Sequence, residues 1–360
     1  MTALPDEELS RYHKRVGAEL SLSPALTGGA AGIGRATALL FASYGANVVI
    51  ADMNMSSAEQ TVLDIQKLRS GDAVAHKCDV TVYEDIVNVF DFALDKFGSV
   101  DIVVANAGVG EIGGSIVYDP KEGIPTKPAT TTIDINLIGV LYTLPRTQPK
   151  FSRTRLPQIH HSSGIYMQVP SVSSESLVLT VRRRHSVDSW TANSRAPLYV
   201  ASKHAVLGLM RSLDKPLSQK GIHINCIHPF YAATNLVPSS VRQLQLAGIP
   251  LTPVPRIAKA IVYAASYTTT LGLGGSSFWV PDGGALTFMI PKEEFKPGVY
   301  QLIDAKSNST SVGLSGPRYY ARFLKDVTPW LWKPLALAST SATLLTLGVR
   351  FIMTQRVRKS

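Results

Sequence analysis

A tyrosine and a lysine stand four residues apart in the stretch "APLYVASKHAV", as Tyr199 and Lys203. Four residues are about one helical turn, so on a helix the two side chains share a face. A cation beside a phenol favours the phenolate and therefore lowers the phenol pKa. A tyrosine activated in this way can act as a general base, for example toward the proton of a hydroxyl group.

A glycine-rich stretch, "ALTGGAAGIGRATALL", carries Gly28, Gly32 and Gly34 between a predicted strand and a predicted helix. Glycines at such a junction allow a tight turn and a close approach to a pyrophosphate, whose charge is stabilised at the helix N-terminus. Asp52 closes the next predicted strand, eighteen residues after Gly34. A carboxylate there accepts hydrogen bonds from ribose hydroxyls and repels a 2′-phosphate. We therefore expect NAD, with NADP as the less favoured cofactor and Arg35 as the residue able to weaken that preference.

The hydrophobic pattern predicts the scaffold that would position these residues. Short apolar runs alternate with segments that are apolar at three- and four-residue steps, and the runs lie at 47–51, 73–80, 100–108, 176–180, 222–229 and 276–284. This alternation is typical of an α/β fold, a Rossmann-type doubly wound parallel sheet with helices on both faces. The strand before the glycines contains Pro24, which lacks an N–H, and this counts against a well-formed strand there without excluding one.

One large domain with additional segments is the expected organisation for 360 residues, 45% of them hydrophobic. The predicted parts are an N-terminal segment at 1–19, the main domain at 20–285 and a C-terminal extension at 286–360. Within the main domain, 144–197 is predicted to be an irregular insert, because Pro145, Pro149 and Pro157 exclude a regular helix.

The net charge of +10 is concentrated in the insert. Between Pro145 and Arg195, eight Lys or Arg stand against two acids, which gives +6 of the +10. No aromatic interleaving or recognised binding motif accompanies these charges, so we do not expect nucleic-acid binding. The histidines have no metal-ligand spacing, and no metal site is predicted.

The N-terminus and the cysteines are typical of a cytoplasmic protein, whereas the C-terminus leaves open whether the chain contacts a membrane. The N-terminus has acids where an export signal would be apolar, and Cys78 and Cys226 provide no disulfide framework. Near the C-terminus, sixteen uncharged residues run from Pro334 to Val349. This run is shorter than the roughly 20 apolar residues of a spanning helix. A membrane anchor or interfacial helix and a docked or frayed amphipathic tail both stay open.

Together these features resemble the short-chain dehydrogenase/reductase family over about residues 20–285. The family motifs stand here as TGxxxGxG at 27–34, "ANAG" at 105–108, the helix asparagine at Asn136, and YxxxK at Tyr199 and Lys203. The turn after the sixth strand, "NCIHPFYAAT", keeps Thr234 but has Phe230 where the family has glycine. Within the family, the sequence is most similar to the 15-hydroxyprostaglandin dehydrogenase-like branch.

The resemblance implies an NAD-dependent oxidoreductase that interconverts a secondary alcohol and a ketone. Tyr199 would be the base, Lys203 would lower its pKa, and Asn136 would hold a water that links Lys203 to solvent. A serine would bind the substrate oxygen. The implied cofactor-binding residues are Thr27, Gly28, Gly32, Ile33, Gly34, Asp52, Asp79, Val80, Asn106, Ala107, Gly108, Ile227 and Thr234. The family also implies a homo-oligomer.

Two serines each satisfy one of the two family spacings. Ser163 lies 27 residues after Asn136 but 36 before Tyr199, whereas Ser186 lies 50 after and 13 before. Ser163, in "SSG", matches the serine-rich signature of the family and is our first choice. The run at 176–180 is the better buried strand, however, and no serine follows it directly. Ser163, Ser186 and neither therefore stay open. If neither serves, the protein would be a catalytically impaired nucleotide-binding homologue.

Overall fold

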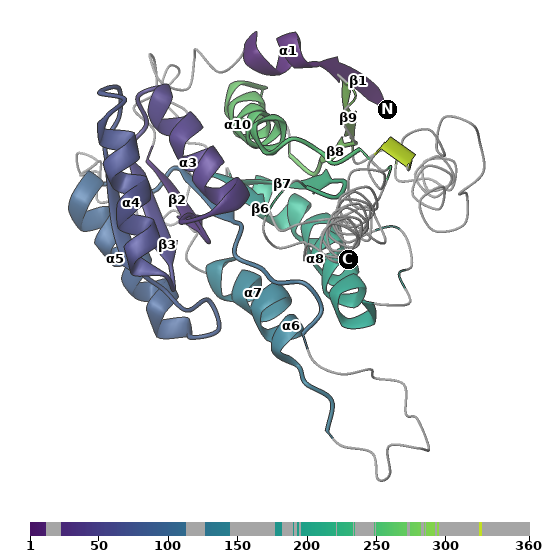
Figure 1. Ribbon diagram of the computed structural model, residues 1–360, viewed down its shortest axis with the longest axis horizontal. Coiled ribbons are helices and arrows are strands. Elements are labelled where there is room, and N and C mark those ends of the chain that lie inside the picture. The colour runs from purple at the N-terminus through teal and green to yellow at the C-terminus, as the bar shows by residue number, and fades with distance from the viewer. Residues whose placement is uncertain are drawn as a thin grey trace, which may run out of the picture. The chain divides into compact units, whose positions relative to one another are not determined.

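A nine-stranded sheet forms the centre of the computed structural model (Figure 1). The structure describes residues 1–11, 23–112, 127–144, 177–181, 190, 193, 196–220, 222–232, 234, 248, 250–271, 274–281, 284, 286–291, 294 and 324–325. Of residues 10–11, 177–181 and 266–271 it describes the backbone only.

Seven of the strands are parallel, in the order β4-β3-β2-β5-β6-β7-β8. They are β2 (Pro24–Thr27), β3 (Val48–Asp52), β4 (Ala73–Lys77), β5 (Ile102–Ala105), β6 (Leu177–Val181), β7 (Ile222–Pro229) and β8 (Ser277–Val280). The strand order reverses between β2 and β5. In a sheet of this kind, such a reversal leaves a crevice at the carboxyl ends of the two strands.

Two antiparallel strands extend the sheet beyond β8. β9 (Leu286–Ile290) pairs with β8, and β1 (Thr2–Pro5) pairs with β9. The N-terminal segment predicted at 1–19 thus contributes its first residues to the main sheet, which the sequence pattern did not indicate. The short α1 (Asp6–Arg11) follows β1, and Arg256 binds Asp6 through a hydrogen bond of 3.0 Å.

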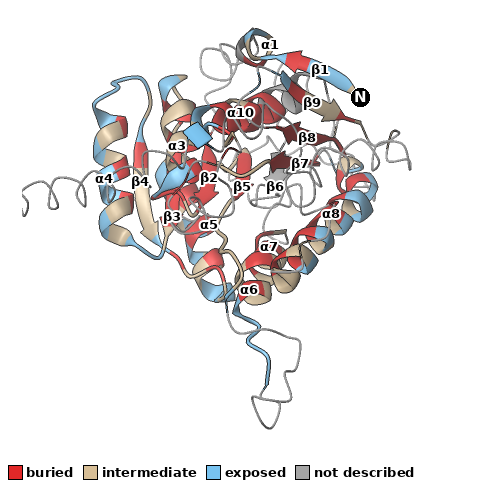
Figure 2. Ribbon diagram, turned by 45° about the vertical axis from the view of Figure 1, so that its right-hand side comes forward, coloured by how far each residue is buried: buried red, intermediate tan, exposed pale blue. Residues whose placement is uncertain are grey.

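Helices cover both faces of the sheet (Figure 2). They are α3 (Gly32–Ser43), α4 (Met55–Gln66), α5 (Tyr83–Phe97), α6 (Thr131–Ile133), the π-helix η2 (Asp134–Ile138), α7 (Gly139–Thr143), α8 (Pro197–Ser218) and α10 (Val254–Leu271). One hydrophobic core joins the sheet to α3, α4 and α10, and another joins it to α5, α7 and α8. Successive strand residues alternate between the cores: Leu26 belongs to the first and Ala25 to the second. The predicted doubly wound parallel fold is confirmed.

The first strand is well formed despite Pro24. β2 is fully buried and pairs with β3 on one side and β5 on the other. Pro24 is tolerated because it is the first residue of the strand, the position at which a missing N–H removes least from a ladder.

The strand expected at 176–180 is present as β6, Leu177–Val181, between β5 and β7. Apart from β6 and a few single residues, the predicted insert at 144–197 lies outside the described residues.

The chain forms two compact units. The first comprises Met1–Leu236 and Leu251–Ser307, and it contains the sheet and every contact discussed below. The second comprises Val237–Pro250 and Asn308–Ser360. The apolar run at 334–349 belongs to the second unit and lies outside the described residues. No helix in the described part of the chain is long and apolar enough to cross a membrane.

Candidate functional site

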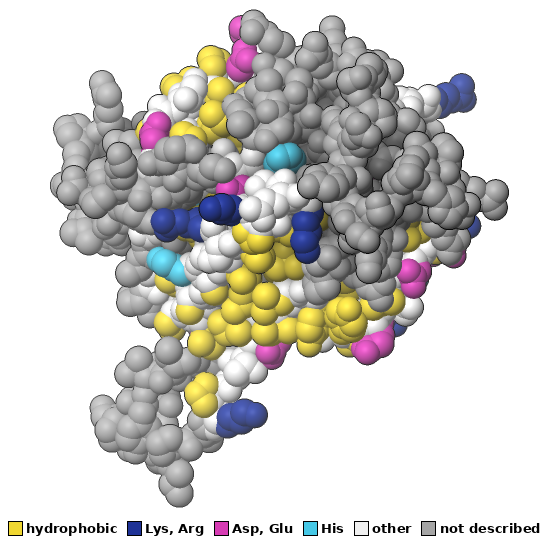
Figure 3. Space-filling model, turned by 180° about the vertical axis from the view of Figure 1, so that it is seen from behind, with side chains coloured by type: hydrophobic (Ala, Val, Ile, Leu, Met, Phe, Trp, Pro, Cys, Tyr) yellow, Lys and Arg dark blue, Asp and Glu magenta, His cyan; other side chains and the backbone are white. Residues whose placement is uncertain are grey.

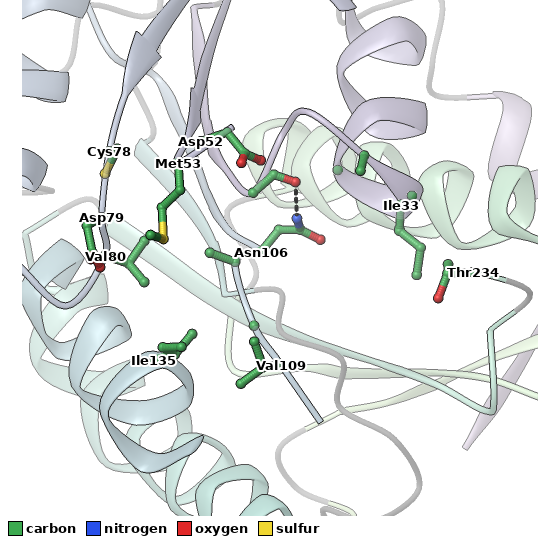
Figure 4. Close-up of a pocket in the computed structure, with 16 residues that line it drawn as sticks. Ile33, Asp52, Met53, Cys78, Asp79, Val80, Asn106, Val109, Ile135 and Thr234 are labelled. Carbon is green, nitrogen blue, oxygen red and sulfur yellow. Dashed lines mark hydrogen bonds between the residues drawn. The ribbon is translucent and has the colours of Figure 1, made fainter. Parts of the chain in front are cut away.

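A cleft of about 530 Å³ lies at the carboxyl ends of β2, β3 and β5 (Figure 4). This is the crevice expected from the strand order, and its volume is in the range of cofactor sites. Eleven of the thirteen predicted cofactor-binding residues line it: Gly28, Gly32, Ile33, Gly34, Asp52, Asp79, Val80, Asn106, Ala107, Gly108 and Thr234. The cleft also has lining residues that the motifs did not indicate: Ala31, Met53, Cys78, Val109 and Ile135.

The glycine turn brings backbone to the cleft at distances that no side chain permits. Gly28 has φ +64° and its N–H donates to the Ala51 carbonyl at 2.8 Å. A Cβ on Gly34 would lie 2.0 Å from the Gly28 carbonyl oxygen. Helix α3 begins directly at this turn, and Ala31 at its N-cap has no side-chain acceptor. A diphosphate fits this helix start, because it would accept hydrogen bonds from the first-turn N–H groups and complement the helix dipole.

Asn106 joins the glycine turn to the neighbouring strand. Its Nδ2 donates to the carbonyl oxygens of Thr27 at 3.0 Å and of Gly28 at 2.8 Å. In return, the Thr27 hydroxyl oxygen accepts from the N–H groups of Asn106 and Ala107 at 3.1 and 3.2 Å. Thr27 therefore supports the cleft rather than lining it, and Asn106 braces the end of β5 against the glycine turn.

Asp52 lies at the end of β3, with its carboxylate at the edge of the cleft (Figure 4). One carboxylate oxygen accepts from the Ala30 N–H and the other from the Asn54 N–H, both at 3.0 Å. These bonds fix the orientation of the carboxylate at the edge of the cleft. Arg35 binds Asp64 at 2.6 Å instead. Hydrogen bonds from Lys67 and Arg35 lower the pKa of Asp64 to about 2.

The far end of the cleft is formed by Cys78, Asp79 and Val80. Asp79 accepts two hydrogen bonds from Thr81, which hold its carboxylate in a turn. Burial raises the pKa of the Cys78 thiol to about 12, and the neighbouring aspartates add to the effect. The Cys78 side chain is therefore a neutral, apolar part of the cleft lining rather than a reactive thiol.

Tyr199 and Lys203 share a buried face of α8, as their spacing predicts. Tyr199 is 8% exposed and Lys203 is fully buried. The Lys203 ammonium nitrogen lies 4.7 Å from the centroid of the Tyr199 ring, within the range of a cation–π contact. A phenol and a buried cation in direct contact form a group that can release and accept a proton.

Asn136 lies within η2, a wide helical turn that packs against α8. Its side chain is fully buried and makes a paired contact with Val109: Nδ2 donates to the Val109 carbonyl at 2.9 Å, and Oδ1 accepts from the Val109 N–H at 3.0 Å. A π-helical turn inside a helix is frequent at functional sites. The sequence indicated the asparagine but not the unusual turn around it.

Glu111 is the residue near the site that sequence reasoning missed. Its carboxylate accepts hydrogen bonds from the N–H groups of Leu198 and Tyr199, at 3.2 and 2.7 Å. The partners are 87 and 88 residues away in the chain, so no local pattern could have indicated the contact.

The remaining predicted residues lie at three kinds of position. Thr234 lines the cleft, whereas Ile227 is buried in β7 and does not line it. Ser163 and Ser186 lie outside the described residues. Within the part of the chain that is described, no cluster of His, Cys, Asp and Glu could hold a metal ion.

The sequence model of the family described as short chain dehydrogenase matches residues 25–175 and 185–245. A (+)-borneol dehydrogenase from Salvia officinalis is 30% identical over 291 residues, which are 76% of this chain and 92% of that protein. A 7alpha-hydroxysteroid dehydrogenase from Escherichia coli is 28% identical, over 65% of this chain and 80% of that protein.

Two solved structures have the same fold. One is a 3-ketoacyl-(acyl-carrier-protein) reductase from Brucella melitensis complexed with NADH, with a TM-score of 0.58 and 22% identity, covering 73% of this chain and 98% of that one. The other is an NADPH-dependent 3-quinuclidinone reductase from Rhodotorula rubra, with a TM-score of 0.59 and 22% identity, covering 76% and 94%. With a glycine turn at a parallel-sheet crevice and a Tyr-Lys pair on a buried helix face, the chain belongs to the short-chain dehydrogenase/reductase family.

Proposed function

We propose that the protein uses NAD to interconvert a secondary alcohol and a ketone. The observation that carries this proposal is the contact between Tyr199 and Lys203, with the lysine fully buried and its ammonium 4.7 Å from the phenol ring. A buried cation so close to a phenol stabilises the phenolate, which is the form that removes a hydroxyl proton.

In the oxidative direction, the Tyr199 phenolate accepts the proton of the substrate hydroxyl, and Lys203 stabilises the phenolate before the transfer. The nicotinamide, when bound, supplies the acceptor for the hydride from the carbinol carbon. The products are the ketone, the reduced cofactor and a neutral Tyr199. Asn136 is proposed to hold a water near Lys203, which would pass the Tyr199 proton toward solvent. Its amide uses one acceptor and one donor on Val109 and keeps a further lone pair and hydrogen for such a water.

NAD rather than NADP is supported by two carboxylates. The Asp52 carboxylate lines the cleft at the end of β3, and it would repel the 2′-phosphate of a bound NADP. Arg35, the cation that could offset this repulsion, is bound to Asp64. The solved relatives named above carry NADH in one case and depend on NADPH in the other, so the preference of this chain rests on its own residues.

The serine of the site is proposed to be Ser163 or Ser186. Ser163 is supported by its "SSG" context and by lying inside the first stretch matched by the family. Ser186 is supported by β6, because that strand ends at Val181 and Ser186 is the first serine after it. The same observation favours the second candidate function, a nucleotide-binding homologue with impaired catalysis, since no serine follows β6 directly.

A cytoplasmic location and a homo-oligomer are further parts of the proposal. The oligomer is supported by the hydrophobic side chains gathered on the face seen in Figure 3.

Formation of NADH tests the proposal directly. The purified full-length chain is assayed with NAD and a panel of secondary alcohols that starts from the substrates of its relatives: borneol, a 7α-hydroxysteroid and cyclohexanol. Tyr199→Phe is the matched variant, since it removes only the hydroxyl. We expect turnover by the wild type and a loss of about 10²-fold or more in kcat for the variant. NAD binding without turnover of any alcohol by the wild type would identify the impaired homologue instead.

A further inference from the structure

We propose that Glu111 is a positioning residue for α8, the helix that carries the proposed base: its carboxylate holds the first turn of α8 and thereby fixes the position of Tyr199. This inference rests on the proposed function, because it assigns a role in the reaction of that same site.

The start of α8 needs an acceptor from elsewhere in the chain. The N-cap residue, Ala196, has no side-chain oxygen, and Pro197 at the first helical position has no N–H. The first intrahelical bond is made by Val200, whose N–H donates to the Ala196 carbonyl at 2.9 Å. Between these positions, the N–H groups of Leu198 and Tyr199 point out of the helix end and must be satisfied by another part of the protein.

Glu111 satisfies both groups at once. Oε1 accepts from the Leu198 N–H at 3.2 Å and Oε2 from the Tyr199 N–H at 2.7 Å. Hydrogen bonds to a carboxylate are stronger than bonds between neutral groups, and a negative charge at a helix N-terminus is stabilised by the helix dipole. Glu111 is only partly exposed, so solvent screens the interaction less than it would on the open surface. The residue that donates the shorter of the two bonds, Tyr199, is the proposed base itself.

The loop that carries Glu111 is fixed on both sides. Before it, Val109 makes its paired contact with Asn136. After it, the Ile112 N–H donates to the Thr132 hydroxyl at 2.9 Å. The same loop continues from Ala107 and Gly108, which line the cleft. Glu111 therefore connects three parts of the proposed site: the cofactor cleft, the asparagine turn and the helix with Tyr199 and Lys203.

This arrangement makes Glu111 more than a helix cap. Tyr199 lies in the first turn of α8, so any fraying of that turn moves its hydroxyl relative to the substrate. A misplacement of about 1 Å can lower the rate by about 10²-fold. Loss of the carboxylate should therefore lower kcat much more than the affinity for the cofactor, which is bound by the glycine turn and Asp52.

The test compares Glu111→Ala and Glu111→Gln in the full-length protein, with Glu84→Ala as the matched control. Glu84 is an exposed acid in the first turn of α5, a helix without proposed catalytic residues. Glu111→Gln keeps one acceptor oxygen and should retain part of the rate. We measure kcat, KM for the alcohol, NADH affinity by fluorescence, and hydrogen exchange of a peptide covering residues 197–203.

We expect Glu111→Ala to lower kcat by about 10- to 100-fold, with little change in NADH affinity and faster exchange in the 197–203 peptide. Glu111→Gln should lie between wild type and Glu111→Ala, and Glu84→Ala should match the wild type. Wild-type kcat in Glu111→Ala would overturn the inference. A parallel loss of kcat and NADH affinity in both Glu111 variants would also overturn it, because it would mean general destabilisation.

A failure of the proposed function can be distinguished from a failure of the inference about Glu111. If the wild type oxidises no alcohol, the proposed function fails. Hydrogen exchange of the 197–203 peptide then remains as the test of whether Glu111 holds the first turn of α8. Unchanged protection of the 197–203 peptide in Glu111→Ala would then overturn the inference, and faster exchange confined to that peptide would support it.

Discussion

The guanidinium of Arg35, which follows Gly34 directly in the first turn of α3, lies 2.6 Å from a carboxylate oxygen of Asp64 in α4. The contact joins α3 to α4 and engages a cation that would otherwise be available to an anionic cofactor group. Lys67 binds the other carboxylate oxygen of Asp64 at 2.7 Å. We therefore expect Asp64, which does not line the cleft, to influence cofactor choice by holding Arg35.

Cofactor preference is therefore expected to change in two steps. Asp52→Ala removes the ribose acceptor and the repulsion toward a 2′-phosphate, and should lower kcat/KM for NAD by about 10- to 100-fold. Adding Asp64→Asn should free Arg35 and raise kcat/KM for NADP above that of the single variant. Steady-state kinetics with both cofactors measure the change, and Lys67→Ala is the control, since it alters Asp64 but leaves Arg35 bound. NADP kinetics that are the same in the single and double variants would contradict this role of Arg35.

The two serine candidates are separated by single substitutions. β6 ends at Val181, so the serine that follows this strand in the chain is Ser186. Ser163, the first choice from the sequence, precedes this strand, so we now expect Ser186→Ala to lower kcat by about 10²-fold, as loss of a hydrogen bond to a reacting oxygen does, and Ser163→Ala to have little effect. The measurement is kcat for the best alcohol of the panel, with NADH affinity as the check on folding. The reverse result would assign the role to Ser163, and full activity in both variants would contradict a catalytic serine at either position.

Two glycines should respond oppositely to alanine. A Cβ on Gly34 would lie 2.0 Å from the Gly28 carbonyl oxygen, whereas a Cβ on Gly208 would meet nothing within 4 Å. Gly34→Ala should abolish cofactor binding and lower the free energy of unfolding by about 1–3 kcal/mol or more. Gly208 is exposed in the middle of α8, so Gly208→Ala should raise the free energy of unfolding by about 0.5–1 kcal/mol. Urea unfolding and NADH titration check both, and cofactor binding by Gly34→Ala would contradict the close approach at the turn.

The sequence indicates those parts of the candidate site that are encoded locally and leaves the long-range contacts out, for a physical reason. Glycine turns, a strand-end aspartate and a Tyr-Lys pair are each encoded within a few residues, so their spacing is visible. Glu111 acts on an amide 88 residues away, and the π-helical turn at Asn136 depends on its packing against Val109 and α8. The sequence alone did not show that Pro24 is compatible with a well-formed strand. The effect of a proline depends on its position in the strand, and the pairing of Pro24 with Ile102 defines that position.

His228 should make the stability of the protein sensitive to acid. It is fully buried in β7, where Nε2 lies 3.0 Å from the Ser277 hydroxyl and the ring stacks on Trp190 at 4.0 Å. Burial lowers its pKa from 6.5 to about 3. Between these two values the unfolded chain binds a proton that the folded chain does not, so protonation favours unfolding. The free energy of unfolding should therefore fall by about 1.4 kcal/mol per pH unit as the pH drops below 6.5, and His228 should contribute no slope above it.

The slope is measured by urea unfolding between pH 7.5 and about 5, the range in which acidic groups contribute least. His228→Phe keeps a flat ring against Trp190 but cannot titrate. The slope of its free energy of unfolding against pH should therefore be smaller than that of the wild type by the contribution of one proton, about 1.4 kcal/mol per pH unit. Equal slopes in the wild type and His228→Phe would mean that the folded chain admits a proton at this site. In that case the contact between β7 and β8 at Ser277 would have to open before the protein unfolds, because a charged imidazole cannot stay buried there without a new partner.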